Sequence, residues 1–214
     1  MTSKLTIYNG ALTVLGERRL QTVTENREPR LKLDTIWDND MVKRVLQHGQ
    51  WKFALRAVEL EASPSVTPTF GYQFAFDIPV DHIRTIGIAS DEYFSNPLTA
   101  YSVEAQWWFS DAEKIYVQYV SSDVQFGQDY SLWPENFTEY VEHYMAMKVA
   151  PRITGLQFNA QGLKKMVKDT LLEAKSTDAM ESPAKFAPRG GWAQSRQGFR
   201  SGSTERGNRS QLIG

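Results

Sequence analysis

The sequence of 214 residues contains no cysteine. Disulfides, thiolate metal sites and cysteine nucleophiles are therefore excluded. No apolar run approaches 18 residues, which excludes a transmembrane helix, and we predict no membrane partner. The nucleophile elbow, the phosphate-binding loop, the dinucleotide fingerprint and the zinc-protease helix motif are all missing. We therefore expect no enzyme, no cofactor and no metal site.

The charges are unevenly distributed, although the whole chain has a net charge of only −1. Residues 181–214 carry a net charge of +4, and the preceding 180 residues carry −5. Residues 189–214 hold six glycines, four serines and five arginines without any periodic apolar pattern. Such a segment does not bury a core, so we predict a flexible basic arm over residues 181–214.

The basic arm also contains spaced aromatic residues, which are unusual in a pure spacer. Its arginines suit phosphate groups, whereas aromatics interleaved with arginines slightly favour capture of a protein partner. The predicted partner-binding residues are Phe186, Arg189, Trp192, Arg196, Phe199, Arg200, Arg206 and Arg209.

Helical periodicity occurs at both ends of the first 180 residues. The apolar spacing predicts helices over residues 3–15, 29–48, 134–151 and 159–177. Gly16 and Gly49 suit the ends of the first two helices, and Pro151 is expected to end or kink the third. We predict a four-helix body of two helical hairpins, formed by residues 1–50 and 130–180.

A period of two dominates the middle of the chain. It predicts strands over residues 55–60, 70–78, 82–89, 101–110 and 114–121. The expected fold is α+β, with an antiparallel β domain of about five strands inserted at residues 51–129. In the run Trp107–Trp108–Phe109, Trp108 points opposite to its neighbours. One face then belongs to a core, and the other is either more packing or a subunit contact.

Carboxylates recur at helical spacing in two places, at Asp34 and Asp38 and at Glu135, Glu139 and Glu142. A glycosidase uses two such groups at a defined separation, but solvated helix faces have the same pattern. Glu139 and His143 are also four residues apart, so they could form half of a metal site. An exposed ion pair or hydrogen bond gives the same spacing.

Five segments, taken in order, resemble one known family. They are YNGALTVLGERRLQTVTENRE (8–28), WKFALRAVEL (51–60), YQFAFDIPVDHIR (72–84), YSVEAQWWFSDAEKIYVQYV (101–120) and FTEYVEHYMAMKVAPRITG (137–155). The first contains Asn9, Ala11, Leu12, Leu15, Gly16 and Glu17 in an N-x-A-L-x-x-L-G-E pattern. Residues 3 to about 178 resemble the tail tubular protein A family, the head-to-tail adaptor or gatekeeper of podovirus-type bacteriophages.

The resemblance implies a structural protein of the virion tail or neck, assembled in the host cytoplasm. Its members form a homo-oligomeric, dodecameric ring between the portal protein and a tail nozzle protein similar to tail tubular protein B. DNA passes through the lumen without sequence-specific binding. An acidic body would suit such a channel, and the basic arm would dock on the portal.

Two other functions remain open from the sequence. The first is a virion-associated glycan or cell-wall hydrolase that uses the helix carboxylates, with Glu135 and Glu139 as the residues to test. The second is a nucleic-acid-binding accessory protein that acts through the basic arm, with an affinity for duplexes that falls steeply with salt.

Overall fold

A computed structural model describes residues 2–66, 68–155 and 158–181. These residues form a mixed α+β fold with five α-helices and two three-stranded antiparallel sheets. Helices and strands belong to one compact unit, Met1–Ala179, and a second unit covers Met180–Gly214. The eight predicted partner-binding residues lie outside the described residues: Phe186, Arg189, Trp192, Arg196, Phe199, Arg200, Arg206 and Arg209.

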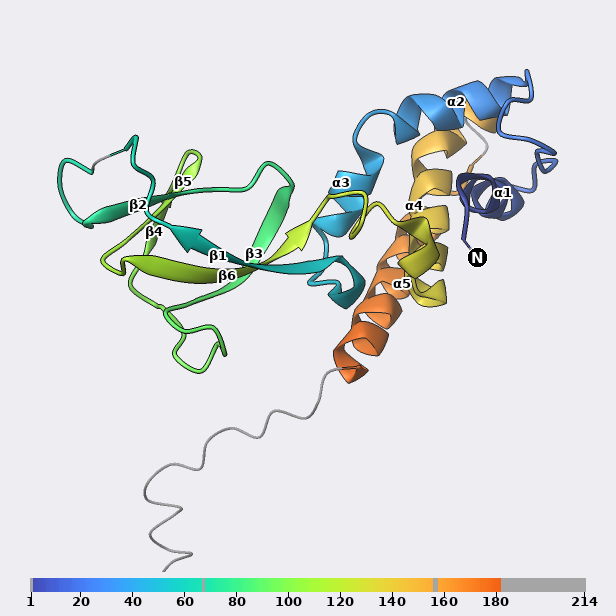
Figure 1. Cartoon of the computed structure of the whole chain (residues 1–214). Coiled ribbons are helices and arrows are strands. Elements are labelled where there is room, and N and C mark those ends of the chain that lie inside the picture. Colours follow the sequence, from blue (N-terminus) through green and yellow to red (C-terminus); the bar gives the residue numbers. More distant parts are fainter. Residues whose placement is uncertain (1, 67, 156–157, 182–214) are drawn as a thin grey trace, which may run out of the picture. The chain divides into compact units, whose positions relative to one another are not determined.

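The helices are α1 (Lys4–Val14), α2 (Glu28–Trp37), α3 (Met41–Leu46), α4 (Glu135–Ile153) and α5 (Ala160–Met180). Short 3-10 turns, η1 (Lys52–Ala54) and η2 (Tyr130–Leu132), flank the strands. Figure 1 shows α4 and α5 side by side. A hydrogen bond of 2.8 Å from Asn136 Nδ2 to Thr177 Oγ1 joins the start of α4 to the end of α5, so these two helices are antiparallel.

Two helix predictions need correction. The segment 29–48 forms two helices rather than one, because Asp40 adopts a left-handed conformation with φ of 53°. Such a residue cannot continue a right-handed helix, so the described fold has five helices instead of four. Pro151 lies inside the last turn of α4, and the helix ends two residues later, at Ile153.

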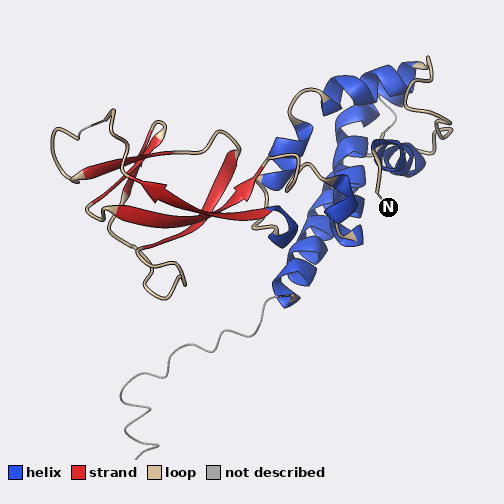
Figure 2. Cartoon of the chain, in the orientation of Figure 1, coloured by secondary structure: helices blue, strands red, loops and turns tan. Residues whose placement is uncertain are grey.

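The strands are β1 (Leu55–Glu61), β2 (Phe74–Asp77), β3 (His82–Ala89), β4 (Ser102–Glu104), β5 (Trp107–Ser110) and β6 (Lys114–Ser121). One sheet has the order β1-β6-β3 and the other has the order β2-β5-β4. Figure 2 shows the strands gathered apart from the helices.

The predicted β domain of about five strands therefore has six strands, and they form two antiparallel sheets. The segment 101–110 is a hairpin of β4 and β5, because Ala105 turns the chain with φ of 50°. The aromatic segment 70–78 pairs only over β2, after Gly71 has taken a φ of 84°. The strands predicted over 55–60, 82–89 and 114–121 are confirmed as β1, β3 and β6, each within one residue.

Aromatic side chains dominate the larger of two cores, which joins the helices. Trp51, Phe137 and Tyr140 are fully buried there, with 4.6 Å between the ring centroids of Trp51 and Phe137. Val120 of β6 belongs to the same core, so the end of this strand is anchored among the helices. The apolar side chains that follow the helical period in α4, such as Phe137, Tyr140 and Tyr144, are buried, whereas Met166 on the apolar stripe of α5 is 42% exposed.

The smaller core lies within the strands and contains Trp108. Its indole is fully buried and packs at right angles to the ring of His82, 5.3 Å away. Trp107 and Phe109 are partly exposed on the opposite face of β5. Trp107 Nε1 donates to Asp77 Oδ1 at 2.9 Å. The core interpretation of Trp108 is therefore confirmed, and the subunit contact on the other face remains a prediction.

Among the described residues, no helix is both long enough and apolar enough to cross a lipid bilayer.

Candidate functional site

A groove between α1 and α4 brings together most of the predicted helix carboxylates. One part, about 580 Å³ in volume, is lined by Thr6, Asn9, Gly10, Thr13, Val14, Arg19, Glu139, Glu142 and His143. A second part of about 590 Å³ adds Glu135 and shares Thr6, Glu139 and Glu142 with the first. We call the whole the acidic groove and define it by Glu135, Glu139 and Glu142.

The floor of the acidic groove depends on a glycine in the middle of a helix. Gly10 lies inside α1, where glycine costs about 0.5–1 kcal/mol relative to alanine. A Cβ atom at this position would come within 1.9 Å of Glu142 Cδ and 2.1 Å of Glu142 Oε2. The missing side chain is what lets the carboxyl group of Glu142 lie directly against α1.

Glu142 is an unusual acid because of this location. Burial, with a smaller contribution from the charge of Glu139, raises its pKa to about 7, and Arg19 partly opposes the shift. Arg19 is held at the groove by its own contact, since its Nε donates to Thr13 Oγ1 at 3.2 Å. At neutral pH the acidic groove therefore contains a carboxyl group that gains from a nearby positive charge.

His143 is the second unusual group in the acidic groove. Its side chain is only 8% exposed, and Nδ1 has no hydrogen-bond partner in the described part of the chain. An unpaired buried polar atom is uncommon and costs free energy unless a partner arrives from outside. Glu139 and His143 thus share a groove as their spacing suggested, but residues 2–66, 68–155 and 158–181 contain no cluster of three or more groups placed to hold a metal ion.

The other candidate residues serve different purposes in the described structure. Asp34 accepts hydrogen bonds from Tyr8 Oη at 2.7 Å and Arg30 Nη1 at 2.6 Å, and it pairs with Lys4 Nζ at 3.1 Å. This cluster ties α1 to α2 and leaves Asp34 occupied. His48 Nδ1 and Tyr140 Oη are 2.6 Å apart, and His82 Nε2 lies 2.9 Å from Thr85 Oγ1.

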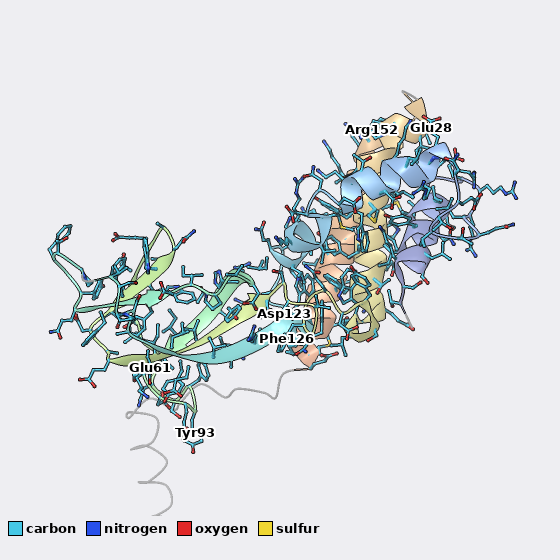
Figure 3. All side chains as sticks on the ribbon, turned by 45° about the horizontal axis from the view of Figure 1, so that its top comes forward. Glu28, Glu61, Tyr93, Asp123, Phe126 and Arg152 are labelled. Atoms are coloured by element: carbon cyan, nitrogen blue, oxygen red, sulfur yellow. The ribbon has the colours of Figure 1, made fainter. Side chains whose placement is uncertain are left out.

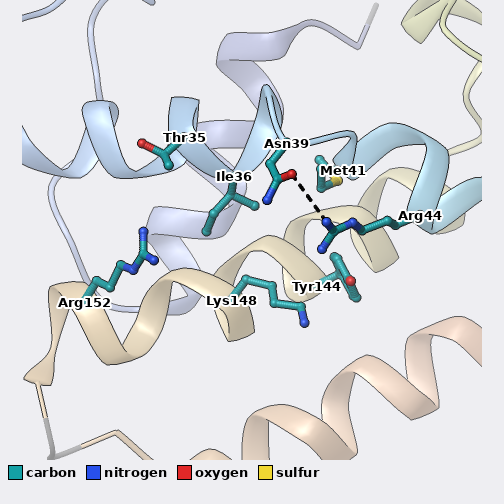
Figure 4. Close-up of a pocket in the computed structure, with 8 residues that line it drawn as sticks. All are labelled: Thr35, Ile36, Asn39, Met41, Arg44, Tyr144, Lys148 and Arg152. Atoms are coloured by element: carbon teal, nitrogen blue, oxygen red, sulfur yellow. Dashed lines mark hydrogen bonds between the residues drawn. The ribbon is translucent and has the colours of Figure 1, made fainter.

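A basic pocket lies on the other side of the helical region, between α2, α3 and the second half of α4 (Figure 4). It has a volume of about 190 Å³ and is lined by Thr35, Ile36, Asn39, Met41, Arg44, Tyr144, Lys148 and Arg152. Its three cations are exposed, and no carboxylate is among the lining residues. Lys148 Nζ lies 5.3 Å from the centroid of the Tyr144 ring, and Arg44 Nη2 donates to Asn39 Oδ1 at 3.4 Å.

Near this pocket, one carboxylate does approach the end of α4. Figure 3 shows Glu28 and Arg152 at the same end of the helices. Lys32 links them, because its Nζ pairs with Glu28 Oε1 at 2.5 Å and donates to the carbonyl oxygen of Arg152 at 2.7 Å. Glu28 is thereby neutralised by Lys32 rather than by the side chain of Arg152.

The first half of α5 adds a second group of cations near the end of α4. Lys164, Lys165 and Lys168 are all exposed, and none of them forms an ion pair with a residue that the structure describes. We call these three residues the lysine ridge. Between Ala160 and Leu172, Asp169 is the only acidic residue of the helix.

Two polar side chains, Asn9 and Asp81, hold separate parts of the fold together. Asn9 clamps the segment after α1, since its Nδ2 donates to the Leu20 carbonyl at 3.0 Å and its Oδ1 accepts from the Leu20 amide at 2.7 Å. Asp81 accepts from Arg56 Nη1 at 2.9 Å and Tyr119 Oη at 3.1 Å, which joins three strands. Figure 3 shows Asp123 and Phe126 close together, where Arg56 also reaches both.

No protein-family model matches the chain, and no curated protein matches it.

Sequence reasoning found Glu135, Glu139, Glu142 and His143, and it missed their partners in the groove. Gly10 was a detectable signal, because a glycine inside an amphipathic helix often marks a close contact with another part of the structure. Arg19 gave none, since it comes from a polar linker whose path depends on the Asn9 clamp. The sequence shows the lysine ridge as a charged helix face, but a charged face alone does not indicate a binding surface, because most surface helices have one. The low burial of the rest of α5 is what distinguishes it.

Proposed function

We propose that this chain is a structural virion protein, the subunit of a head-to-tail adaptor ring. In this proposal it joins the portal to the tail nozzle and continues the DNA channel. The order of its five resembling segments supports the proposal. The hydrogen bonds of Asn9 and Asp81, which lie in two of those segments, also support it. Asn9 holds the segment that follows α1, and Asp81 holds the strands of one sheet together.

The observation that carries the proposal is the incomplete burial of α5. This helix has 21 residues, yet its buried side chains are Leu163 and Ala174. Leu172 and Met180 are 71% and 79% exposed. A long helix with exposed apolar side chains is a surface for neighbouring subunits, and a ring subunit needs such a surface on each flank.

In this proposal, each segment of the chain has a different role in the ring. Residues 1–50 and 130–180 form the helical body that packs between neighbours and against the portal. Residues 51–129 form the β domain on the nozzle side, and residues 181–214 form the basic arm that docks on the portal. Neither a cofactor nor a metal takes part, and DNA passes through a lumen lined by acidic bodies.

The experiment is co-elution of the purified chain with the portal ring of the same virus on a size-exclusion column. We expect the full chain to move with the portal at micromolar concentrations. A chain truncated after Pro188 should lose this co-elution and keep its circular dichroism spectrum. Co-elution of the truncated chain would contradict the role of the arm. If even the full chain stays separate, the adaptor proposal itself fails.

One observation favours a second candidate, a virion-associated glycan hydrolase. Glycosidases pair a carboxyl group of raised pKa with an ionised one, and Glu142 lies with Glu139 in the same groove with its pKa raised to about 7. The pair to test is therefore Glu139 and Glu142, rather than Glu135 and Glu139. Turnover of cell-wall or capsular glycans that is abolished by Glu142→Gln would support this candidate, and absence of turnover by the parent chain would refute it.

A further inference from the structure

We propose that the acidic groove of one copy receives the lysine ridge of a second copy of this chain. The contact would be the subunit interface of the ring, so this inference rests on the proposed function. It names which surfaces meet and which residues make them complementary.

The two surfaces have opposite charge and opposite shape. The acidic groove is a hollow between α1 and α4 that contains three carboxylates and one cation, Arg19. The lysine ridge is the exposed face of a helix, and its three ammonium groups have no partner within the described residues. A helix laid into a groove is a common mode of recognition, and opposite charges fix its register.

Their positions in one copy prevent them from meeting each other. Glu135 and Glu139 lie in the first half of α4. The lysine ridge lies in the first half of α5, which runs antiparallel to α4, as the Asn136–Thr177 hydrogen bond requires. The ridge is therefore near the far end of α4, away from Glu135 and Glu139, and its acidic partner must come from another molecule.

This arrangement gives the helical region an acidic end and a basic end. The dipole of α4 favours acids at its start and cations at its finish, which accounts for part of the polarity but not for a lysine face at the start of α5. Two different surfaces that complement each other make a head-to-tail contact, and a head-to-tail contact that closes produces a ring.

The acidic groove also has groups that a second copy would satisfy. Glu142 is partly buried against Gly10, where its ionised form is disfavoured unless a cation approaches. His143 Nδ1 is buried without a hydrogen-bond partner among the residues that the structure describes. An ammonium group that enters the groove would stabilise the ionised carboxyl group of Glu142. A polar side chain of the ridge helix would provide a hydrogen-bond partner for His143 Nδ1.

Because the chain has no cysteine, single introduced cysteines can report the contact directly. Ser131→Cys labels the acidic groove, and Gln161→Cys labels the exposed face of α5 on which the lysine ridge lies. The two variants are mixed, one of them with an affinity tag, and oxidised with and without the portal ring. A disulfide between them can form only between two copies. Ser90→Cys, exposed after β3, replaces Gln161→Cys in the control.

We expect the Ser131→Cys and Gln161→Cys pair to be the main crosslinked product and the Ser90→Cys pair to give little. Reversing charge at the exposed positions, with Glu135→Lys and Glu139→Lys in one variant and Lys164→Glu and Lys168→Glu in another, should abolish the crosslink when each is paired with an unreversed partner. Combining the reversed groove with the reversed ridge should restore it. Glu92→Lys with Glu113→Lys, in the β region, should have no effect.

Each other outcome identifies a different failure. A stacked ring on the portal without the Ser131–Gln161 crosslink overturns this interface and leaves the proposed function standing. A crosslink in the chain alone, with no ring on the portal, supports the interface and contradicts the proposed function. Absence of both contradicts both. In the chain without the portal, a crosslink that is lost on truncation after Pro188 would show that the contact depends on the basic arm, which contradicts an interface made by the lysine ridge.

Discussion

The carboxyl group of Glu142 lies where a side chain on Gly10 would have to be: a Cβ atom built there comes within 1.9 Å of Glu142 Cδ. One helix therefore carries the residue with no side chain at the point where the other helix places an acid. This pairing buries the acid and raises its pKa to about 7. It also provides two ways to disturb the acidic groove, one steric and one electrostatic.

The steric change is Gly10→Ala. The methyl group displaces only the flexible end of Glu142, so α1 should remain intact and gain about 0.5–1 kcal/mol of intrinsic helix stability. The displaced carboxyl group becomes better hydrated, and its pKa should fall toward the usual value for glutamate. NMR titration of the glutamate side-chain carboxyl carbons measures this shift. A pKa that stays near 7 in Gly10→Ala would show that contact with α1 does not cause it.

The electrostatic change is Glu142→Gln, and its effect depends on pH. The folded pKa of Glu142, about 7, lies above the ordinary value of 4.5, so the folded state binds the extra proton between these two values. Stability therefore falls as pH rises from about 4.5 to 7 and stays low above that. Glu142→Gln should stabilise the fold by about 1–3 kcal/mol at pH 8, after allowance for partial exposure, and by much less near pH 4.

Urea unfolding at the two pH values measures this difference. Glu139→Gln is the matched control, because Glu139 is exposed in the same groove and should change stability little at either pH. Equal effects of Glu142→Gln at pH 4 and pH 8 would contradict the assigned ionisation.

Asp81 should behave in the opposite way. Burial alone would raise its pKa, but hydrogen bonds from Ser121, Arg56 and Tyr119 outweigh burial and lower it. Its contribution to stability is thus present above the ordinary pKa of aspartate and is lost as pH falls through the lowered value. Asp81→Asn should destabilise the fold by about 2–4 kcal/mol at neutral pH, since it leaves Arg56 without its closest charge partner.

Thermal or urea unfolding tests the Asp81 substitution, with Glu113→Gln as a control in an exposed turn of the same region. A change below about 0.5 kcal/mol, the size of an ordinary surface substitution, would mean that Asp81 does not tie the strands together.

Asn9→Ala removes both hydrogen bonds that hold the Leu20 backbone. Because Leu20 is buried and the linker carries Arg19 into the acidic groove, we expect a loss of about 1–3 kcal/mol and faster hydrogen exchange at the Leu20 amide. Asn9→Asp keeps the acceptor and loses the donor, so it should protect the amide better than alanine does. Unchanged exchange in Asn9→Ala would contradict the clamp.

The sequence was most informative where one period persists. The apolar faces of α1 and α4 and the strands β1, β3 and β6 all agree with their spacing, because each keeps one period along its length. The two helices pack into the larger core, and the three strands contribute to both cores. The α+β class and the segregation of helices from strands could be predicted for the same reason.

The corrections occur where a single residue turns the chain. Asp40 and Ala105 take positive φ values, and neither is a glycine. The run Asp38–Asn39–Asp40 was a local signal for the break in 29–48, because Asp and Asn tolerate the left-handed region, whereas Ala105 gave no signal for the hairpin within 101–110. Met166 fits the apolar stripe of α5, yet too little of the helix is covered for that face to be buried. These features depend on tertiary contacts rather than on local propensity.

The candidate site also has a part that the sequence predicts and a part that only the fold shows. Glu135, Glu139, Glu142 and His143 could be predicted to share a helix from their spacing alone. The roles of Gly10 and Arg19 could not, because they come from another helix and a linker that only the fold brings to α4.

The most direct test of the adaptor proposal is electron microscopy of the portal ring mixed with an excess of this chain. We expect a second ring stacked on the portal, with α1, α4 and α5 of each copy between its neighbours and the β strands on the side away from the portal. Portal rings that remain bare at micromolar concentrations of the chain would contradict the account.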